Sequence, residues 1–95
     1  MLPIQQSKSV LTMSSQEISA LVNSRHDSVK RSVERLASLG TIQLPPLVEV
    51  KNGSGQTVEV YMIGKRDSYI VVAQLSPEFT AALVDRWQEL ESSNH

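Results

Sequence analysis

Cysteine is absent from this chain of 95 residues, which excludes disulfide-based scaffolds and zinc sites with thiolate ligands. Histidine is scarce, with only His26 and the terminal His95, so we expect no metal site. No apolar run approaches the roughly 20 residues of a membrane span, and the first ten residues lack the apolar core of a signal peptide. These absences predict a soluble, cytoplasmic protein without a cofactor or membrane contact.

Motifs that accompany catalysis are absent as well. The chain has no nucleophile elbow, phosphate-binding glycine loop or paired-acid motif. Gly53-Ser54-Gly55 resembles part of a phosphate loop, but no strand-to-helix junction surrounds it, so we interpret it as a hairpin turn. We therefore expect no catalytic residue and no enzymatic activity.

The charge of the chain is nearly balanced but unevenly distributed. The net charge is −1 and the isoelectric point is about 6.1, which argues against coating of nucleic acid through charge alone. Residues 25–35 carry four basic and two acidic side chains, whereas residues 76–95 carry four acidic side chains and one basic. Such a separation is compatible with a small DNA-binding domain.

The segment from Ser14 to Gly40 predicts two helices joined by a short polar turn. Ser14–Glu17 matches a capping box and is followed by apolar residues with helical spacing. Asn23-Ser24 interrupts the pattern, because such side chains favour turns and caps over helix interiors. We expect Ser24 to cap the second helix and Gly40 to end it in a left-handed conformation.

The second predicted helix, residues 25–39, has one apolar side formed by Val29, Val33 and Leu36. Its other sides carry polar and basic groups that suit base edges and phosphates. We expect Arg31 and Arg35 to contact guanine or phosphate. His26 and Ser28 are expected to contact bases near the start of the helix. The candidate DNA-binding residues are Arg25, His26, Ser28, Lys30, Arg31 and Arg35. The alternative interpretation is an ordinary amphipathic helix with solvated arginines.

Residues 47–51 and 57–63 alternate apolar with polar side chains, which predicts two half-buried strands. The glycine-rich turn between them supplies the positive φ angles of a β-hairpin. In a winged helix-turn-helix this hairpin is the wing and contacts the DNA backbone, and the alternative is a mobile polar turn. The candidate wing contacts are Lys51, Asn52, Ser54 and Gln56.

The remaining segments predict a turn, a third strand and a last helix. Residues 64–67 are interpreted as a turn whose Lys65 and Arg66 are solvated, and the apolar residues 69–73 as a strand. Ser76, Pro77 and Glu78 are start signals for a helix over residues 77–91. We expect its apolar stripe to pack on the sheet and the first helix, and the alternative is a dimer interface through Leu83, Trp87 and Leu90.

These elements predict one α+β domain over residues 1–95 with a winged helix-turn-helix fold. The expected order is a short strand, two helices, the β-hairpin wing, a third strand and a C-terminal helix. The corresponding ranges are a flexible N-terminus at 1–8, a short strand at 9–13, the helix-turn-helix at 14–40, the wing and third strand at 47–73, and the last helix at 77–91.

Two parts of the chain resemble phage regulators. Residues 13–18 through 25–29 resemble the start of the phage Rha family, whose members have a similar S-x-E-I-A helix and an R-H-x-x-V start to the second helix. Residues 64–69 and 79–90 are similar to the segment closing the N-terminal domain of phage antirepressors and Roi-like or KilA-N-like regulators. The resemblance implies a phage or prophage regulator whose N-terminal domain binds DNA.

Two hypotheses about function follow. The first is a sequence-specific transcriptional regulator whose partner is double-stranded DNA, with a homodimer through the last helix binding two half-sites. The second is an antirepressor-like module that binds a repressor or another regulator protein without binding DNA. The acidic last helix and the small net charge favour the second, and the basic second helix favours the first.

Overall fold

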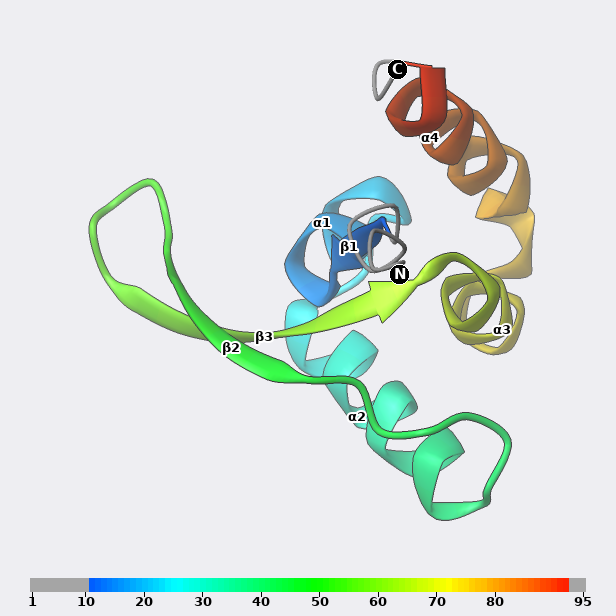
Figure 1. Cartoon of the computed structure of the whole chain (residues 1–95), viewed down its shortest axis with the longest axis horizontal. Coiled ribbons are helices and arrows are strands. Elements are labelled where there is room, and N and C mark those ends of the chain that lie inside the picture. Colours follow the sequence, from blue (N-terminus) through cyan, green and yellow to red (C-terminus); the bar gives the residue numbers. More distant parts are fainter. Residues whose placement is uncertain (1–10, 93–95) are drawn as a thin grey trace, which may run out of the picture.

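The computed structural model describes residues 11–92, and the predicted α+β class is confirmed there. Four α-helices, a short 3₁₀ helix and three strands occupy this range (Figure 1). In chain order they are β1 (Thr12–Ser14), α1 (Ser15–Leu21), α2 (His26–Ser38), β2 (Leu47–Lys51), β3 (Thr57–Gly64), α3 (Lys65–Leu75), η2 (Pro77–Phe79) and α4 (Thr80–Ser92). The predicted tail at 1–8 and the start of the predicted strand at 9–13 lie outside the described residues.

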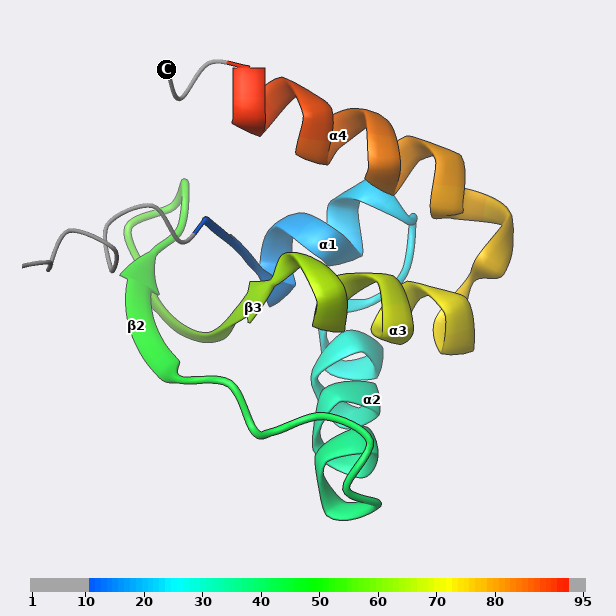
Figure 2. The same ribbon diagram turned by 45° about the vertical axis from the view of Figure 1, so that its right-hand side comes forward.

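The three strands form an antiparallel sheet in the order β1-β3-β2. The central strand β3 pairs Ile63 with Met13 of β1 and pairs Val58 with Val50 of β2. Figures 1 and 2 show the β2-β3 hairpin extending away from α3 and α4. Of the strands that the structure describes, β3 alone pairs with β2, which is therefore an edge strand of this sheet.

Helix α1 begins with half of the predicted capping box. The Ser14 hydroxyl accepts a hydrogen bond from the Glu17 backbone N–H at 3.0 Å, as expected for an N-cap serine. The Glu17 carboxylate does not reach back to the cap. It accepts a hydrogen bond from Arg86 Nε at 2.6 Å instead, and this ion pair ties α1 to α4.

The turn between α1 and α2 contains four residues, Val22 to Arg25, and Asn23 has a left-handed φ of 54°. The prediction that Ser24 caps α2 is wrong. Arg25 is the N-cap residue and makes no side-chain cap hydrogen bond, while the Ser24 hydroxyl lies 3.4 Å from the Ser76 hydroxyl. The side chain of Ser24 therefore lies at the junction with the α3-η2 segment rather than over the first turn of α2.

The end of α2 follows the prediction. Gly40 has a φ of +80°, and its N–H donates to Ala37 O at 3.0 Å. The next N–H, from Thr41, donates to Leu36 O at 3.0 Å. This pair of hydrogen bonds is the Schellman arrangement, which satisfies the last carbonyl groups of the helix.

The predicted strand at 69–73 is wrong, since these residues lie in helix α3. The predicted turn at 64–67 is the end of β3 followed by the first turn of this helix. Ser68, Val71 and Val72 are buried and Leu75 is half-buried, and their spacing of i, i+3, i+4 and i+7 is helical. Burial of this stripe outweighs the strand preference of the β-branched run.

The last helix is divided. Pro77–Phe79 form the 3₁₀ turn η2, α4 runs from Thr80 to Ser92, and Ser76 makes no side-chain cap hydrogen bond. Leu83 is 0% and Trp87 1% exposed, and the Trp87 indole N–H donates to the buried Ser68 hydroxyl at 2.8 Å. Burial of this stripe in the core is thus confirmed, although α4 lies against α1 and α3 rather than against the sheet. The fold itself covers Leu83 and Trp87, and a dimer interface through the last helix stays a prediction. Leu90 is half-buried and packs against the same core.

The core lies where the helices meet one face of the sheet. Buried side chains from the four α-helices form it together with β1, β3 and Ile42 of the connection after α2, and Phe79 of η2 packs against it. Its buried members are Met13, Ile18, Val22, Val29, Val33, Leu36, Ile42, Tyr61, Ile63, Val71, Val72, Leu83 and Trp87.

Candidate nucleic-acid interface

Helix α2 is held by three fully buried or nearly buried side chains, Val29, Val33 and Leu36, which face the core. This packing leaves two flanks with different surroundings. One flank faces α3, and the other faces the central strand β3. The predicted DNA-binding residues of the helix divide between these flanks.

The flank toward α3 carries Ser28, Arg31, Ser32 and Arg35, which we call the basic flank. These side chains and Leu75 line a shallow pocket of about 290 Å³ that contains no carboxylate. Arg35 reaches across to α3, where its Nη2 lies 3.5 Å from Gln74 Oε1. Both arginines are exposed, and neither forms an ion pair with another residue of the described range 11–92. The basic flank is thus an open, cationic and hydroxyl-bearing surface.

The opposite flank of α2 is part of the fold and is acidic. The Tyr61 hydroxyl donates a hydrogen bond to Glu34 Oε2 at 2.7 Å. This hydrogen bond, together with burial and the negative charges of Glu34 and Glu59, raises the pKa of Tyr61 to about 12. Glu49 lies directly opposite Glu59 in the hairpin. Three carboxylates therefore surround this side of the α2-β3 junction, and they would repel a phosphate backbone.

His26 also belongs to the fold. The Tyr61 backbone N–H donates to the Ser15 hydroxyl at 3.0 Å, and that hydroxyl lies 2.8 Å from His26 Nε2. Burial and the nearby Lys30 charge lower the pKa of His26, partly offset by Asp27. A neutral imidazole whose Nε2 accepts a hydrogen bond from the Ser15 hydroxyl fits this arrangement. The Nε2 atom of His26, which was predicted to contact a base, is therefore already hydrogen-bonded to Ser15.

The other predicted residues of this region are exposed or half-buried. Arg25 is exposed at the N-cap of α2, and Lys30 is half-buried beside His26. Ser32 was not among the predicted residues, although it lies one turn after Ser28 on the same flank. That helical spacing is the signal by which the sequence indicates it.

The hairpin tip is organised by Asn52. Its side-chain oxygen accepts three hydrogen bonds, from the Ser54 N–H at 3.0 Å, the Ser54 hydroxyl at 2.8 Å and the Gln56 N–H at 3.0 Å. Lys51 is exposed on the same strand face as Glu49. Figures 1 and 2 both show the tip away from α2, so the structure does not bring the predicted wing residues and the basic flank together.

Lys65 and Arg66 lie in the first turn of α3 and are each paired with a carboxylate. Lys65 Nζ lies 2.7 Å from Glu91 Oε2, which raises the pKa of this lysine, and Arg66 Nη1 lies 2.8 Å from Asp67 Oδ1. These two basic residues are therefore neutralised locally. They form a natural contrast to the unpaired arginines of α2.

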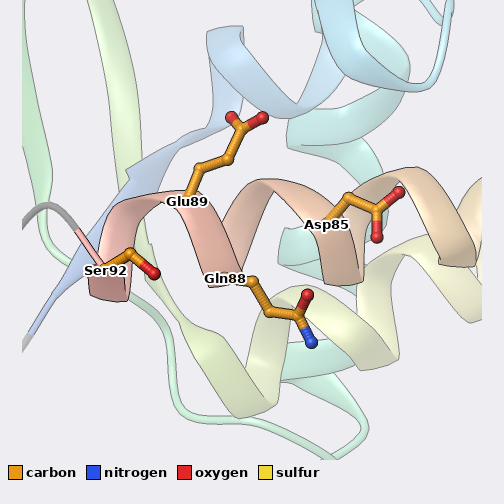
Figure 3. A pocket seen from close by; sticks show the side chains of 4 residues that line it. All are labelled: Asp85, Gln88, Glu89 and Ser92. Atoms are coloured by element: carbon orange, nitrogen blue, oxygen red, sulfur yellow. The ribbon is translucent and has the colours of Figure 1, made fainter.

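A second surface with distinct chemistry lies on α4. Asp85, Gln88, Glu89 and Ser92 line a broad open hollow, and all four side chains come from this one helix (Figure 3). Arg86 Nη1 lies 3.1 Å from Glu89 Oε1, whereas Asp85 has no ion pair within residues 11–92. The surface is acidic and polar.

Residues 11–92 contain neither a cluster of metal ligands nor a helix able to span a membrane. No group of three or more histidine, aspartate or glutamate side chains in this range is placed to hold a metal ion. No helix in it combines the length and the apolar character that crossing a membrane needs.

Comparison with known proteins adds one finding. A family model described as phage regulatory protein Rha matches residues 13–92. No curated protein and no solved structure matches the chain. The match begins within β1, ends with the last residue of α4 and includes residues 13–18 and 25–29, which resemble the family in sequence. The chain therefore belongs to the phage regulatory protein Rha family.

Proposed function

We propose that this protein is a sequence-specific DNA-binding regulator that contacts the major groove with the basic flank of α2. The observation that carries the proposal is the pair Arg31 and Arg35, exposed one turn apart and without a carboxylate partner in the described range. Membership in a family of phage regulatory proteins supports a regulatory role. Arginine is the side chain best suited to guanine and phosphate, because its planar group donates two parallel hydrogen bonds.

The two flanks of α2 give the proposal an orientation. Ser28 and Ser32 supply short hydroxyl contacts to bases beside the arginines, and Arg25 supplies a phosphate contact near the helix start. The flank with Glu34 points away from the nearest phosphates, because the carboxylates around Tyr61 would repel them. The helix is thus tilted toward its α3 side in the groove.

The proposed fold type is a winged helix-turn-helix, in which β1 precedes the helix pair and the β2-β3 hairpin follows it. Ser54 and Gln56 at the exposed tip remain predicted contacts to the DNA backbone. We expect them to contribute less than the arginines, because the tip lies away from α2 and carries no charge beyond Lys51.

A binding titration against phage regulatory DNA at two salt concentrations tests the proposal. The double variant Arg31→Ala/Arg35→Ala should lower affinity by at least about tenfold and should flatten the salt dependence, because fewer counterions are released. Fluorescence anisotropy with labelled duplexes measures both quantities. Thermal unfolding of the variant checks that α2 remains folded.

The matched control is Lys65→Ala/Arg66→Ala, which removes the same amount of positive charge. These two residues lie at the start of α3, whereas Gln74 and Leu75 beside the basic flank lie at its end. It should change affinity by less than about threefold, because both side chains are paired with carboxylates. Equal losses in the two double variants would mean that net charge, and not the basic flank, governs binding.

The acidic surface of α4 favours a second candidate function, a module that binds a basic protein partner. In that case Asp85→Asn/Glu89→Gln should abolish capture of a repressor from lysogen extract while Arg31→Ala/Arg35→Ala leaves it intact. Absence of any DNA retardation by the unmodified protein, together with such capture, would select this function over the first.

A further inference from the structure

Two exposed apolar side chains of this protein lie in its edge strand β2. Within residues 11–92, the large apolar residues with exposed side chains are Leu39, Leu44, Leu47 and Val48, and the last two open β2. Leu47 is 47% and Val48 38% exposed, although both lie in a strand. No described element other than β3 pairs with β2. Among residues 11–92, the outer edge of β2 is thus unpaired and partly apolar.

The hydrogen bonds at the two ends of the hairpin show which backbone groups face outward. Met62 N donates to Pro46 O at 3.0 Å, and Asn52 N donates to Gln56 O at 2.9 Å. In an antiparallel ladder the bonded residues alternate, so Val48 and Val50 also bond to β3. The N–H and C=O groups of Leu47, Glu49 and Lys51 therefore point away from the sheet, toward any strand that docks there.

The side chains along this edge carry an unresolved electrostatic conflict. Glu49 and Glu59 are directly opposite one another, and both are exposed. Like charges in this position are unfavourable. Lys51, two residues after Glu49 on the same strand face, is opposite the neutral Thr57 and pairs with no carboxylate in the described range.

We propose that β2 pairs antiparallel with β2 of a second copy of this chain, about a two-fold axis at Val50. In this register Glu49 lies opposite Lys51 of the second copy, and Lys51 lies opposite Glu49 of the second copy. Each of these two pairs exchanges two backbone hydrogen bonds, because both residues present their N–H and C=O groups outward. The two Val50 side chains meet on the other face of the sheet.

Charge selects this register over its neighbours. An axis at Glu49 would place the two Glu49 side chains opposite each other and would line up four glutamates with the two Glu59 residues. An axis at Val48 would place Glu49 opposite Leu47, which offers no cation. Only the axis at Val50 gives each Glu49 a lysine and relieves its conflict with Glu59.

The pairing joins two sheets into one of six strands and places both α2 helices on the same side of it, since the paired strands keep their faces. Such a dimer would present two α2 helices, the proposed DNA-contacting helices, related by two-fold symmetry. It also assigns Lys51 to the second copy rather than to phosphate. The self-association does not depend on the DNA proposal, which rests on Arg31 and Arg35.

Cysteine cross-linking tests the register, because the chain has no cysteine of its own. Val50→Cys should form a disulfide-linked dimer under mild oxidation, since residues facing each other in a non-hydrogen-bonded pair have Cα atoms about 4.5 Å apart. Val48→Cys, on the same face but opposite Asn52 of the second copy, should not. Cross-linking of Val48→Cys at least as fast as Val50→Cys would overturn the register.

Exchanging the charges at positions 49 and 51 tests the proposed Glu49–Lys51 pairing between two copies. Sedimentation equilibrium over a range of concentrations measures the association. The unmodified chain should approach twice the monomer mass as concentration rises. Glu49→Lys and Lys51→Glu should each weaken association at least about tenfold, and the double variant Glu49→Lys/Lys51→Glu should restore it. An unmodified chain that stays monomeric throughout, or a double variant no better than the single ones, would overturn the proposal.

Protein stability separates this result from misfolding. Glu49→Lys removes the repulsion from Glu59 within the hairpin, so its unfolding temperature should equal or exceed that of the unmodified chain while its association weakens. A joint loss of folding and association would overturn the assignment of Glu49 to the intermolecular contact.

Discussion

At the scale of single residues, a few polar side chains decide which flank of α2 is free. Tyr61 is central, because its N–H binds the Ser15 hydroxyl and its own hydroxyl binds Glu34. Ser15 in turn contacts His26. These contacts fasten one flank of α2 to α1 and β3, and they leave Arg31 and Arg35 on the other flank exposed.

The contact of His26 predicts a pH dependence of stability. The pKa of His26 lies below 6.5 in the folded protein, so the unfolded chain binds the proton more readily. The contribution of the neutral ring is therefore complete above about pH 6.5 and is lost as pH falls through the lowered folded pKa. Thermal unfolding between about pH 7 and pH 5 should show a falling transition temperature.

His26→Gln is the matched variant, because glutamine keeps an acceptor for the Ser15 hydroxyl but does not titrate in this range. Its unfolding temperature should fall less than that of the unmodified chain over the same pH interval. Parallel curves for the two proteins would contradict the assignment of this pH dependence to His26.

At the scale of elements, the sequence predicts secondary structure correctly where one local pattern dominates a segment. It fails where strand and helix patterns compete in the same segment. The capped start of α1, the Gly40 end of α2 and the hairpin all follow from local chemistry in the sequence. Residues 69–73 were predicted as a strand because β-branched residues favour strands, yet they fold as α3. The stripe that includes Val71 and Leu75 needs the rest of the core before its helical spacing outweighs that preference.

The candidate site shows the same division. Helical periodicity identified Arg31, Arg35 and Ser28 on the polar side of α2 but gave His26 the same status. Which flank meets β3 depends on where the sheet lies, and one segment alone does not contain that information. Ser32 differs, because its helical spacing from Ser28 already indicates it in the sequence.

The hairpin supplies an element-scale prediction. The sequence predicts positive φ angles at Asn52-Gly53 and at the second glycine, Gly55, and of these three residues only Gly55 has one, at +87°. Gly55→Ala should therefore lower the free energy of unfolding by about 1–2 kcal/mol, because a left-handed φ is strained for alanine. Gly53→Ala, where an added Cβ meets nothing within 4 Å, should change it by less than about 0.5 kcal/mol.

Urea unfolding of both variants measures the difference. The two substitutions stiffen the unfolded chain equally, so the comparison isolates the folded conformation at the tip. Equal effects of the two substitutions would contradict the assignment of the left-handed position to Gly55.

At the scale of the whole molecule, charge and apolar surface are separated onto different parts of the fold. The basic flank of α2, the acidic surface of α4 and the edge of β2 lie on different elements, although the net charge is only −1. Near-neutral overall charge thus coexists with local surfaces that suit different partners. Binding of DNA, of a basic protein and of a second copy would use distinct residues.

The most direct test of the central claim is selection of binding sequences from a pool of random DNA duplexes, with the unmodified chain and Arg31→Ala/Arg35→Ala in parallel. The unmodified chain should enrich a defined motif with guanine at positions that lose their preference in the double variant. No enriched motif with the unmodified chain, or the same motif with both proteins, would contradict DNA recognition through the basic flank of α2.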